Sequence, residues 1–176
     1  DLHDPRIRID LQAPEPERIA RRDLRGAAQD GAQPRQQFAR LELKQPFEES
    51  LALKQQSMDE TLEALEGLVA YQVADVTAAA TYYIAQVYLN FSASLLDSER
   101  PEGLTQAEMN SYELVIEEEA YPFEEQAIEI HQANTSRASE GVYDEWVRKS
   151  FERLAELLPA RYAKAEMGVP AVENIN

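Results

Sequence analysis

The sequence predicts an all-α fold with about four long helices between residues 45 and 162. Apolar residues recur in that part of the chain every three or four positions, which is the period of one helical face. No segment alternates apolar and polar residues as a half-buried strand does, and no hairpin-type turn sequence joins two such segments. Short connections between the helices favour antiparallel helical hairpins, and 44% hydrophobic residues suffice for a packed core.

Residues 1–44 are predicted to be an extended or weakly helical arm or linker. Four of the nine prolines of the chain lie in this segment, and its charge is nearly balanced, with nine Lys or Arg against eight Asp or Glu. The stretch PERIARRDLRGAAQ, residues 16–29, is the one part with a helical pattern, because Pro16 suits a first turn and Ile19 and Leu24 are its apolar positions. An arm with one weak helix therefore fits better than a folded subdomain.

The first long helix is predicted to begin near Gln45. Its apolar face consists of Phe47, Leu51, Met58, Leu62, Leu65 and Val69. Its other face carries Glu48, Glu49, Lys54, Gln55, Asp59, Glu60, Glu63 and Glu66. We interpret this second set as a solvated surface, as is usual for an amphipathic helix.

The second helix is predicted from the segment DVTAAATYYIAQVYLNFSASLLD, residues 75–97, whose interior carries no charge. Asp75 or Thr77 can cap its N-terminus, and the helix is expected to end near Ser98. The preceding turn is expected within residues 71–76, although a single bent helix through this region stays open. A bilayer span needs about 20 mostly apolar residues. The Thr, Gln, Asn and Ser side chains here favour a helix buried by protein, so no membrane span is predicted.

The start of the third helix is predicted at Thr105 and Glu108, which form the Thr-x-x-Glu pattern of a capping box. Its apolar positions are Leu114, Val115, Ala120, Phe123, Ala127 and Ile130. Pro122 lies inside this helix, where the missing N–H and a clash with the Glu118 carbonyl predict a bend or break. The Tyr121-Pro122-Phe123 corner is expected to pack between helices.

The fourth helix is predicted to follow Gly141 and to stop at Pro159. Its apolar side consists of Tyr143, Trp146, Val147, Phe151, Leu154, Leu157 and Leu158. The helical domain is therefore placed at residues 45–162. Residues 163–176 have no periodicity and are predicted to be a flexible tail.

Residues with catalytic or metal-binding chemistry are sparse. The chain has no cysteine, and its two histidines, His3 and His131, lie in different contexts. Di-iron bundles need Glu-x-x-His pairs, but Ile128 stands three positions before His131. No P-loop, Gly-x-Ser-x-Gly, His-Glu-x-x-His or dinucleotide-binding motif occurs. The sequence therefore predicts no enzyme, no cofactor and no metal site, and His131 is interpreted as a surface or interface residue.

Negative charge is concentrated after residue 44. Residues 45–176 carry 25 Asp or Glu against eight Lys or Arg, within a formal net charge of −16. Such a surface repels phosphate backbones, so nucleic acid is not an expected partner, and it attracts basic protein segments. The candidate partner-binding acidic face consists of Glu117, Glu118, Glu124 and Glu125. The candidate groove aromatics are Tyr82, Tyr83 and Tyr88.

Two short patterns resemble a tetratricopeptide repeat. Ile84-Ala85 followed by Tyr88 is similar to the Leu-Gly/Ala-x-x-Tyr core of the first repeat helix, although Thr81 stands at the Trp-like position. The spacing of the second repeat helix is matched by Val147, Phe151, Leu154, Leu157 and Pro159. The resemblance implies right-handed stacking of helix pairs, in which small residues let each pair pack on the next.

A wider resemblance covers roughly residues 45–165. The segments FEESLALKQQSMDETLEALEGLVAYQVADVTAAATYYIAQVYLNFSASLLDSERP, EEEAYPFEEQAIEIHQANT and GVYDEWVRKSFERLAELLPARYAK are similar to the C-terminal portion of bacterial tetratricopeptide-repeat proteins found with TonB, ExbB and ExbD type systems. That family implies a periplasmic, non-catalytic scaffold for protein–protein interaction; a cytoplasmic location stays open. The alternatives are a self-assembling module that packs on another copy or on preceding repeats, and a small-ligand-binding helical domain lined by the tyrosines.

Overall fold

The computed structural model describes residues 32–162, and every regular element within that range is helical. The long helices are α3 (Phe47–Val69), α4 (Ala74–Leu96) and α5 (Gln106–Ser136). The shorter ones are α2 (Ala32–Arg40), the 3-10 turn η1 (Arg137–Glu140), α6 (Glu145–Leu157) and α7 (Pro159–Tyr162). The prediction of an all-α fold is confirmed for this part of the chain.

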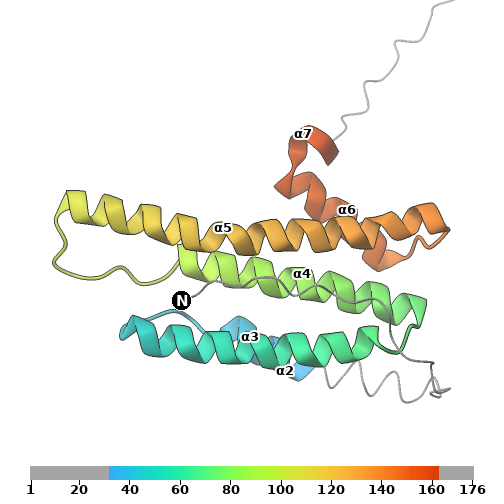
Figure 1. Ribbon diagram of the computed structural model, residues 1–176, viewed down its shortest axis with the longest axis horizontal. Coiled ribbons are helices and arrows are strands. Elements are labelled where there is room, and N and C mark those ends of the chain that lie inside the picture. Colours follow the sequence, from blue (N-terminus) through green and yellow to red (C-terminus); the bar gives the residue numbers. More distant parts are fainter. Residues whose placement is uncertain (1–31, 163–176) are drawn as a thin grey trace, which may run out of the picture.

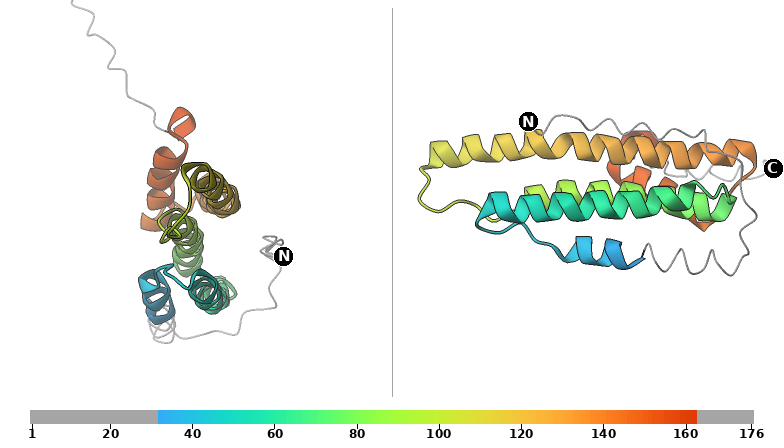
Figure 2. Two further views of the ribbon diagram at one scale, coloured as in Figure 1. Left: turned by 90° about the vertical axis from the view of Figure 1, so that its left-hand side faces the viewer. Right: turned by 60° about the horizontal axis from the view of Figure 1, so that its bottom comes forward.

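The long helices lie side by side, and the chain reverses direction from each to the next (Figure 1). Viewed along the helices, α4 occupies the centre, with α2 and α3 on one side of it and α5 and α6 on the other (Figure 2). Accordingly α4 contacts all four of these helices. Between α2 and α6 one face of α4 is left less covered.

The composition of α4 explains its central place. Ala78, Ala80 and Ala85 are almost fully buried, and such small side chains let neighbouring helices approach closely. Larger apolar residues of α4 fill the core on several sides, namely Ile84, Val87, Tyr88, Phe91 and Leu95. The uncharged segment is thus a helix surrounded by protein, as the sequence predicted.

The turn between α3 and α4 lies at residues 70–73, so the alternative of a single bent helix is wrong. Gln72 adopts a left-handed backbone conformation with φ 53°, which glycine usually supplies at the end of a helix. The N-cap of α4 is Val73, whose side chain accepts no capping bond, so neither Asp75 nor Thr77 is the cap. Asp75 instead lies in the first turn, where its charge suits the helix dipole.

Helix α5 begins with the predicted capping box. The Thr105 hydroxyl accepts from the Glu108 N–H, and the Glu108 carboxylate accepts from the Thr105 N–H at 2.8 Å. The helix then continues through Pro122 to Ser136, so the predicted break is wrong. Proline inside a helix costs about 3 kcal/mol, and packing of the following turns on α4 offsets this cost.

Only part of the Tyr121-Pro122-Phe123 corner packs between helices. Phe123 contacts Phe91 with ring centroids 4.6 Å apart and also stacks near Tyr88. Tyr121 is 59% exposed and donates to the Glu125 carboxylate at 2.8 Å. The expectation that all three residues pack between helices is therefore wrong for Tyr121.

The packed body extends further towards the N-terminus than residue 45. Helix α2 belongs to the segment predicted as an arm, yet Phe38 and Leu43 are buried in the common core. Helix α2 packs against α3 and covers Lys54, whereas most of the other residues predicted on the solvated face of α3 are exposed. The predicted helix at residues 16–29 and the predicted tail at 163–176 lie outside the described residues.

Candidate functional site

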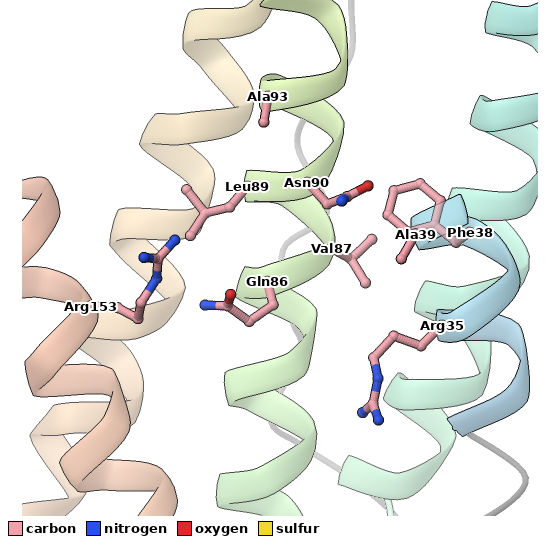
Figure 3. A pocket seen from close by; sticks show the side chains of 9 residues that line it. All are labelled: Arg35, Phe38, Ala39, Gln86, Val87, Leu89, Asn90, Ala93 and Arg153. Carbon is pink, nitrogen blue, oxygen red and sulfur yellow. The ribbon is translucent and has the colours of Figure 1, made fainter. Parts of the chain in front are cut away.

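A groove opens over α4 between α2 and α6. Its volume is about 390 Å³, and Figure 3 shows the side chains that line it. Helix α2 contributes Arg35, Phe38 and Ala39, helix α6 contributes Arg153, and α4 contributes Gln86, Val87, Leu89, Asn90 and Ala93. We call this site the α4 groove.

Charge in the α4 groove is opposite to that of the chain as a whole. Two of its lining residues are arginines and none is acidic, although the net charge of the chain is −16. The Arg35 guanidinium lies 3.5 Å from the centre of the Tyr83 ring. The Arg153 guanidinium pairs with Glu156, and its Nε is buried without an acceptor among the described residues.

Two further hollows adjoin the α4 groove along the same helix and share lining residues with it; unlike the α4 groove, both also have acidic residues in their lining. The second shares Arg35, has a volume of about 330 Å³ and is lined largely by apolar residues up to Tyr83 and Trp146. The third shares Asn90 and Ala93 and has a volume of about 520 Å³. Together these hollows follow α4 from its first turn to its last.

A buried lysine lies on the α2 side of α4. The Lys54 ammonium donates to the Leu41 carbonyl at 2.7 Å, to the Asn90 amide oxygen at 3.0 Å and to the Phe38 carbonyl at 3.3 Å. Two of these acceptors belong to the end of α2, where a cation also offsets the helix dipole. Lys54 is 0% exposed, and burial lowers its pKa to about 8. We call Lys54 with these partners the Lys54 centre.

His131 is a buried histidine on the α6 side of α4. Its Nε2 lies 3.2 Å from the Gln86 amide nitrogen, and its Nδ1 lies 3.2 Å from the Ser150 hydroxyl. Asn134 donates to the same hydroxyl at 2.9 Å and to the Ala78 carbonyl at 3.1 Å. Burial, together with the positive charge of Arg153, lowers the pKa of His131 to about 4. We call this group the His131 centre.

The structure corrects the predicted environments of Lys54 and His131. The sequence pattern predicts Lys54 on a solvated face and His131 at a surface or interface, but each is 0% exposed, so both predictions are wrong. The reason for the first error is α2, which covers Lys54 and was not expected to pack there. Ser150 is also 0% exposed, so a substrate has no access to the hydroxyl beside His131 in this structure.

The three predicted groove aromatics lie in two places. Tyr82 and Tyr83 contact Trp146 of α6 with ring centroids 5.6 and 5.0 Å apart. Tyr88 lies on another side of α4, where it is 4% exposed and stacks near Phe123. Burial, with smaller effects of Glu66 and Asp59, raises its pKa to about 12. Of the three, only Tyr83 lines a hollow continuous with the α4 groove.

The predicted acidic face lies on α5. Glu117, Glu118 and Glu125 are exposed, and Glu124 is partly buried. These carboxylates do not converge on a point, since no group of three or more acidic or histidine residues within 32–162 has the geometry of a metal site. Among the described helices, none has the length and apolar character needed to cross a membrane.

The comparisons with known proteins add no identification. Neither a family model, nor a curated protein, nor a solved structure matches the chain. The tetratricopeptide-repeat resemblance therefore rests on the sequence patterns alone.

Sequence reasoning missed the residues that define the α4 groove. A signal was present in α4, because Gln86 and Asn90 stand four residues apart and thus on one helical face of an otherwise apolar helix. Arg35 and Arg153 had no such signal. They meet α4 from helices that lie before and after it in the chain, so only the tertiary arrangement brings them together.

Proposed function

We propose that the chain is a non-catalytic helical scaffold that binds a protein partner through the exposed side of α5. The observation that supports this proposal is a row of exposed residues that share one face of that helix. The row, which we call the α5 stripe, consists of Leu114, Glu117, Glu118, Tyr121 and Glu125. Leu114 is 57% exposed, and within residues 32–162 no other helix covers it or Tyr121.

The α5 stripe combines two kinds of recognition. Burying an apolar side chain such as Leu114 against a partner contributes about 1.5–3 kcal/mol. The glutamates would attract a basic segment and would make its association faster at low salt. A basic amphipathic segment, with apolar residues on one face, matches both properties.

We propose further that this scaffold acts as an accessory of a periplasmic TonB-type or other envelope machinery, with right-handed stacking of helix pairs. The support for this step is the sequence resemblance of residues 45–165. Fractionation of cells that produce the protein, followed by detection in periplasmic and cytoplasmic extracts, tests the location directly.

Site-directed photocrosslinking tests the partner-binding role. A photoreactive phenylalanine analogue replaces Tyr121 of the α5 stripe or, as the control, the exposed Gln56 of α3. We expect a discrete crosslinked species with the first protein and not with the second. Glu118→Lys combined with Glu125→Lys should abolish the crosslink, and added salt should weaken it.

Two outcomes would count against the proposal. Equal crosslinking from the two positions would mean that the α5 stripe has no special role. A crosslinked species that contains only copies of this chain, together with a mass that rises with concentration in light scattering, would favour the alternative of a self-assembling module.

A further inference from the structure

The hollow beside Trp146 has a lining that the scaffold role does not use. We infer that residues 16–29 of the same chain dock in this hollow. The inference is independent of the proposed role of the α5 stripe, because no residue of α5 lines the hollow. We call it the Trp146 hollow, and its apolar lining includes Leu65 and Leu68 of α3, Val76, Ala80 and Tyr83 of α4, and Trp146 of α6.

The first argument is the size and the apolar character of the Trp146 hollow. Its volume of about 330 Å³ is far larger than the roughly 30 Å³ of one water molecule, so it has room for side chains. Aliphatic side chains supply much of the lining, and the rings of Tyr83 and Trp146, with centroids 5.0 Å apart, add to it. Covering such a surface with apolar side chains removes it from water, which is favourable.

The second argument is the place where α2 begins. Helix α2 has nine residues, whereas α3 and α4 have 23 each, so α2 covers only part of their length, as Figure 2 shows. Arg35, in the first turn of α2, lines the Trp146 hollow, and its guanidinium carbon lies 3.5 Å from the centre of the Tyr83 ring. Phe38 and Ala39, further along α2, line the α4 groove instead. Helix α2 therefore runs away from the Trp146 hollow, and its first residue, Ala32, lies at the end nearest to it.

A short tether joins the proposed segment to this end of α2. The three steps of chain from position 29 to Ala32 span at most about 11 Å. A tether of this length holds the segment beside the Trp146 hollow at an effective concentration of about millimolar. Weak binding is therefore sufficient for docking within the chain.

The third argument is the sequence of the segment, PERIARRDLRGAAQ. Ala20, Leu24 and Ala28 recur every four positions, so a helix would present them on one face, and Ile19 stands next to that face. A face of small and apolar residues suits a hollow between helices, because small side chains let helices approach closely. The helical pattern predicted for this segment thus has a matching surface on α3 and α4.

Charge supports the same occupant. The segment carries four arginines against two acidic residues. Asp75 lines the Trp146 hollow, and none of the ion pairs within residues 32–162 involves it. On α3, Glu66 stands between the two lining leucines in the sequence, and burial, together with the charge of Glu63, raises its pKa. A basic segment would offset the charge of these carboxylates, whereas an acidic surface would be repelled by them.

Crosslinking of paired cysteines tests the inference in the full chain. The chain contains no cysteine, so a bismaleimide joins only introduced thiols, and its reach exceeds one helical turn of about 5.4 Å. Ala28→Cys is combined with Val76→Cys in the Trp146 hollow or, as the control, with Ala93→Cys at an exposed position of the same helix. A tethered but undocked segment would reach both positions at similar rates, because they lie on either side of Tyr83. We expect the Val76 pair to react about tenfold faster than the Ala93 pair.

Two apolar residues of the segment separate docking from proximity. Ile19→Ser combined with Leu24→Ser keeps the tether but removes the side chains that would fill the hollow. The preference for Val76 over Ala93 should then fall to less than about twofold. Val172→Ser combined with Ile175→Ser makes the same kind of change within residues 163–176 and should leave the preference unchanged.

Trp146 gives an independent readout, because it is the only tryptophan of the chain and lines the hollow. Ile19→Ser combined with Leu24→Ser should raise the acrylamide quenching of its fluorescence by about twofold, because the ring loses its cover. The control pair of substitutions should not. Circular dichroism shows whether each variant has folded, and the two cysteine pairs in the otherwise unchanged chain give the answer if the serine variant has not.

Three results would overturn the inference. The first is an equal rate for the two cysteine pairs, and the second is a preference for Val76 that survives the loss of Ile19 and Leu24. The third is a crosslinked product of twice the chain mass, which would mean that a second copy supplies the segment. None of these results depends on the α5 stripe, so the two proposals stand or fall separately.

Discussion

The Lys54 centre and the His131 centre lie on two sides of the same helix and differ in charge. Each contains one fully buried titratable side chain and one amide from α4, Asn90 in the first case and Gln86 in the second. The pKa of Lys54 is lowered to about 8, so Lys54 is charged at neutral pH. The pKa of His131 is lowered to about 4, so His131 is neutral there.

The ordinary pKa values of the two side chains explain this difference: burial lowers that of Lys54 from 10.5 to about 8 and that of His131 from 6.5 to about 4, so the two groups stay on opposite sides of neutral pH. Their partners suit the resulting charges. An ammonium has three donors, and the structure supplies three oxygen acceptors around Lys54. The His131 ring has only a hydroxyl and an amide as partners, both of which suit a neutral imidazole, and Arg153 opposes a positive charge on it. Both side chains are fully buried, yet only the ammonium keeps its charge at neutral pH, because the ordinary pKa of lysine is much higher than that of histidine.

Removing Lys54 should give the largest effect. Lys54→Ala loses buried packing and leaves carbonyls at the end of α2 without a donor, so we expect a loss of about 4 kcal/mol in the free energy of unfolding. Lys54→Met keeps most of the packing and should lose about 2 kcal/mol. Urea denaturation followed by circular dichroism measures both. If Lys54→Met is as stable as the unchanged protein, the three hydrogen bonds contribute nothing measurable.

The His131 centre should show itself in the pH dependence of stability. The pKa of His131 is near 4 in the folded protein and near 6.5 when unfolded, so the unfolded chain binds the extra proton first. His131 therefore contributes about 3 kcal/mol to the free energy of unfolding above pH 6.5, and this contribution is lost as the pH falls towards 4. His131→Phe should lack this component, and the difference between the two proteins removes the common contribution of the carboxylates. Identical pH profiles would contradict the neutral assignment.

Ser150→Ala tests how the His131 centre is held together. The substitution removes the partner of the histidine Nδ1 and one acceptor of Asn134, while it changes volume little. We expect a loss of about 2 kcal/mol in the free energy of unfolding. Ser139→Ala, at an exposed serine in η1, provides the control and should change stability by less than about 0.5 kcal/mol.

The smallest effect is expected at the turn that precedes α4. Gln72→Gly relieves the left-handed conformation of a residue with a Cβ and should raise the free energy of unfolding by about 0.5–1 kcal/mol. The same increment should appear in Lys54→Ala and in His131→Phe, because distant sites usually add. A different increment in one of these backgrounds would mean that this turn is energetically coupled to that centre.

Periodicity in the sequence predicted the long helices, and the capping box at Thr105 marked the start of α5 correctly. The periodicity could not predict the environment of Lys54, because each position on a helical face is solvated or buried according to what packs on it. Helix α2 covers Lys54, and the pattern of charged and Gln residues in α2 gave little sign of packing. The predicted helix break at Pro122 is wrong for a related reason, because contacts of α5 with α4 offset the local cost of the proline.

The α5 stripe and the α4 groove also differ in how far the sequence could predict them. The α5 stripe lies on one helix, so its glutamates could be selected from spacing. The α4 groove is assembled from α2, α4 and α6, and its two arginines are separated by most of the described chain. A single sequence holds no spacing that would pair them.

The first turns of α5 extend beyond the end of α4, as Figure 1 shows, and the buried residues of α5 begin only at Ile116. Apart from Tyr112, which packs against the core, residues 106–115 are thus held mainly by their own backbone bonds and by the Thr105 capping box. Their amide hydrogens should exchange with solvent far faster than those of the following turns, because opening there breaks few tertiary contacts. Since the α5 stripe begins within this segment, slowed exchange in residues 106–115 would report that a partner has occupied it.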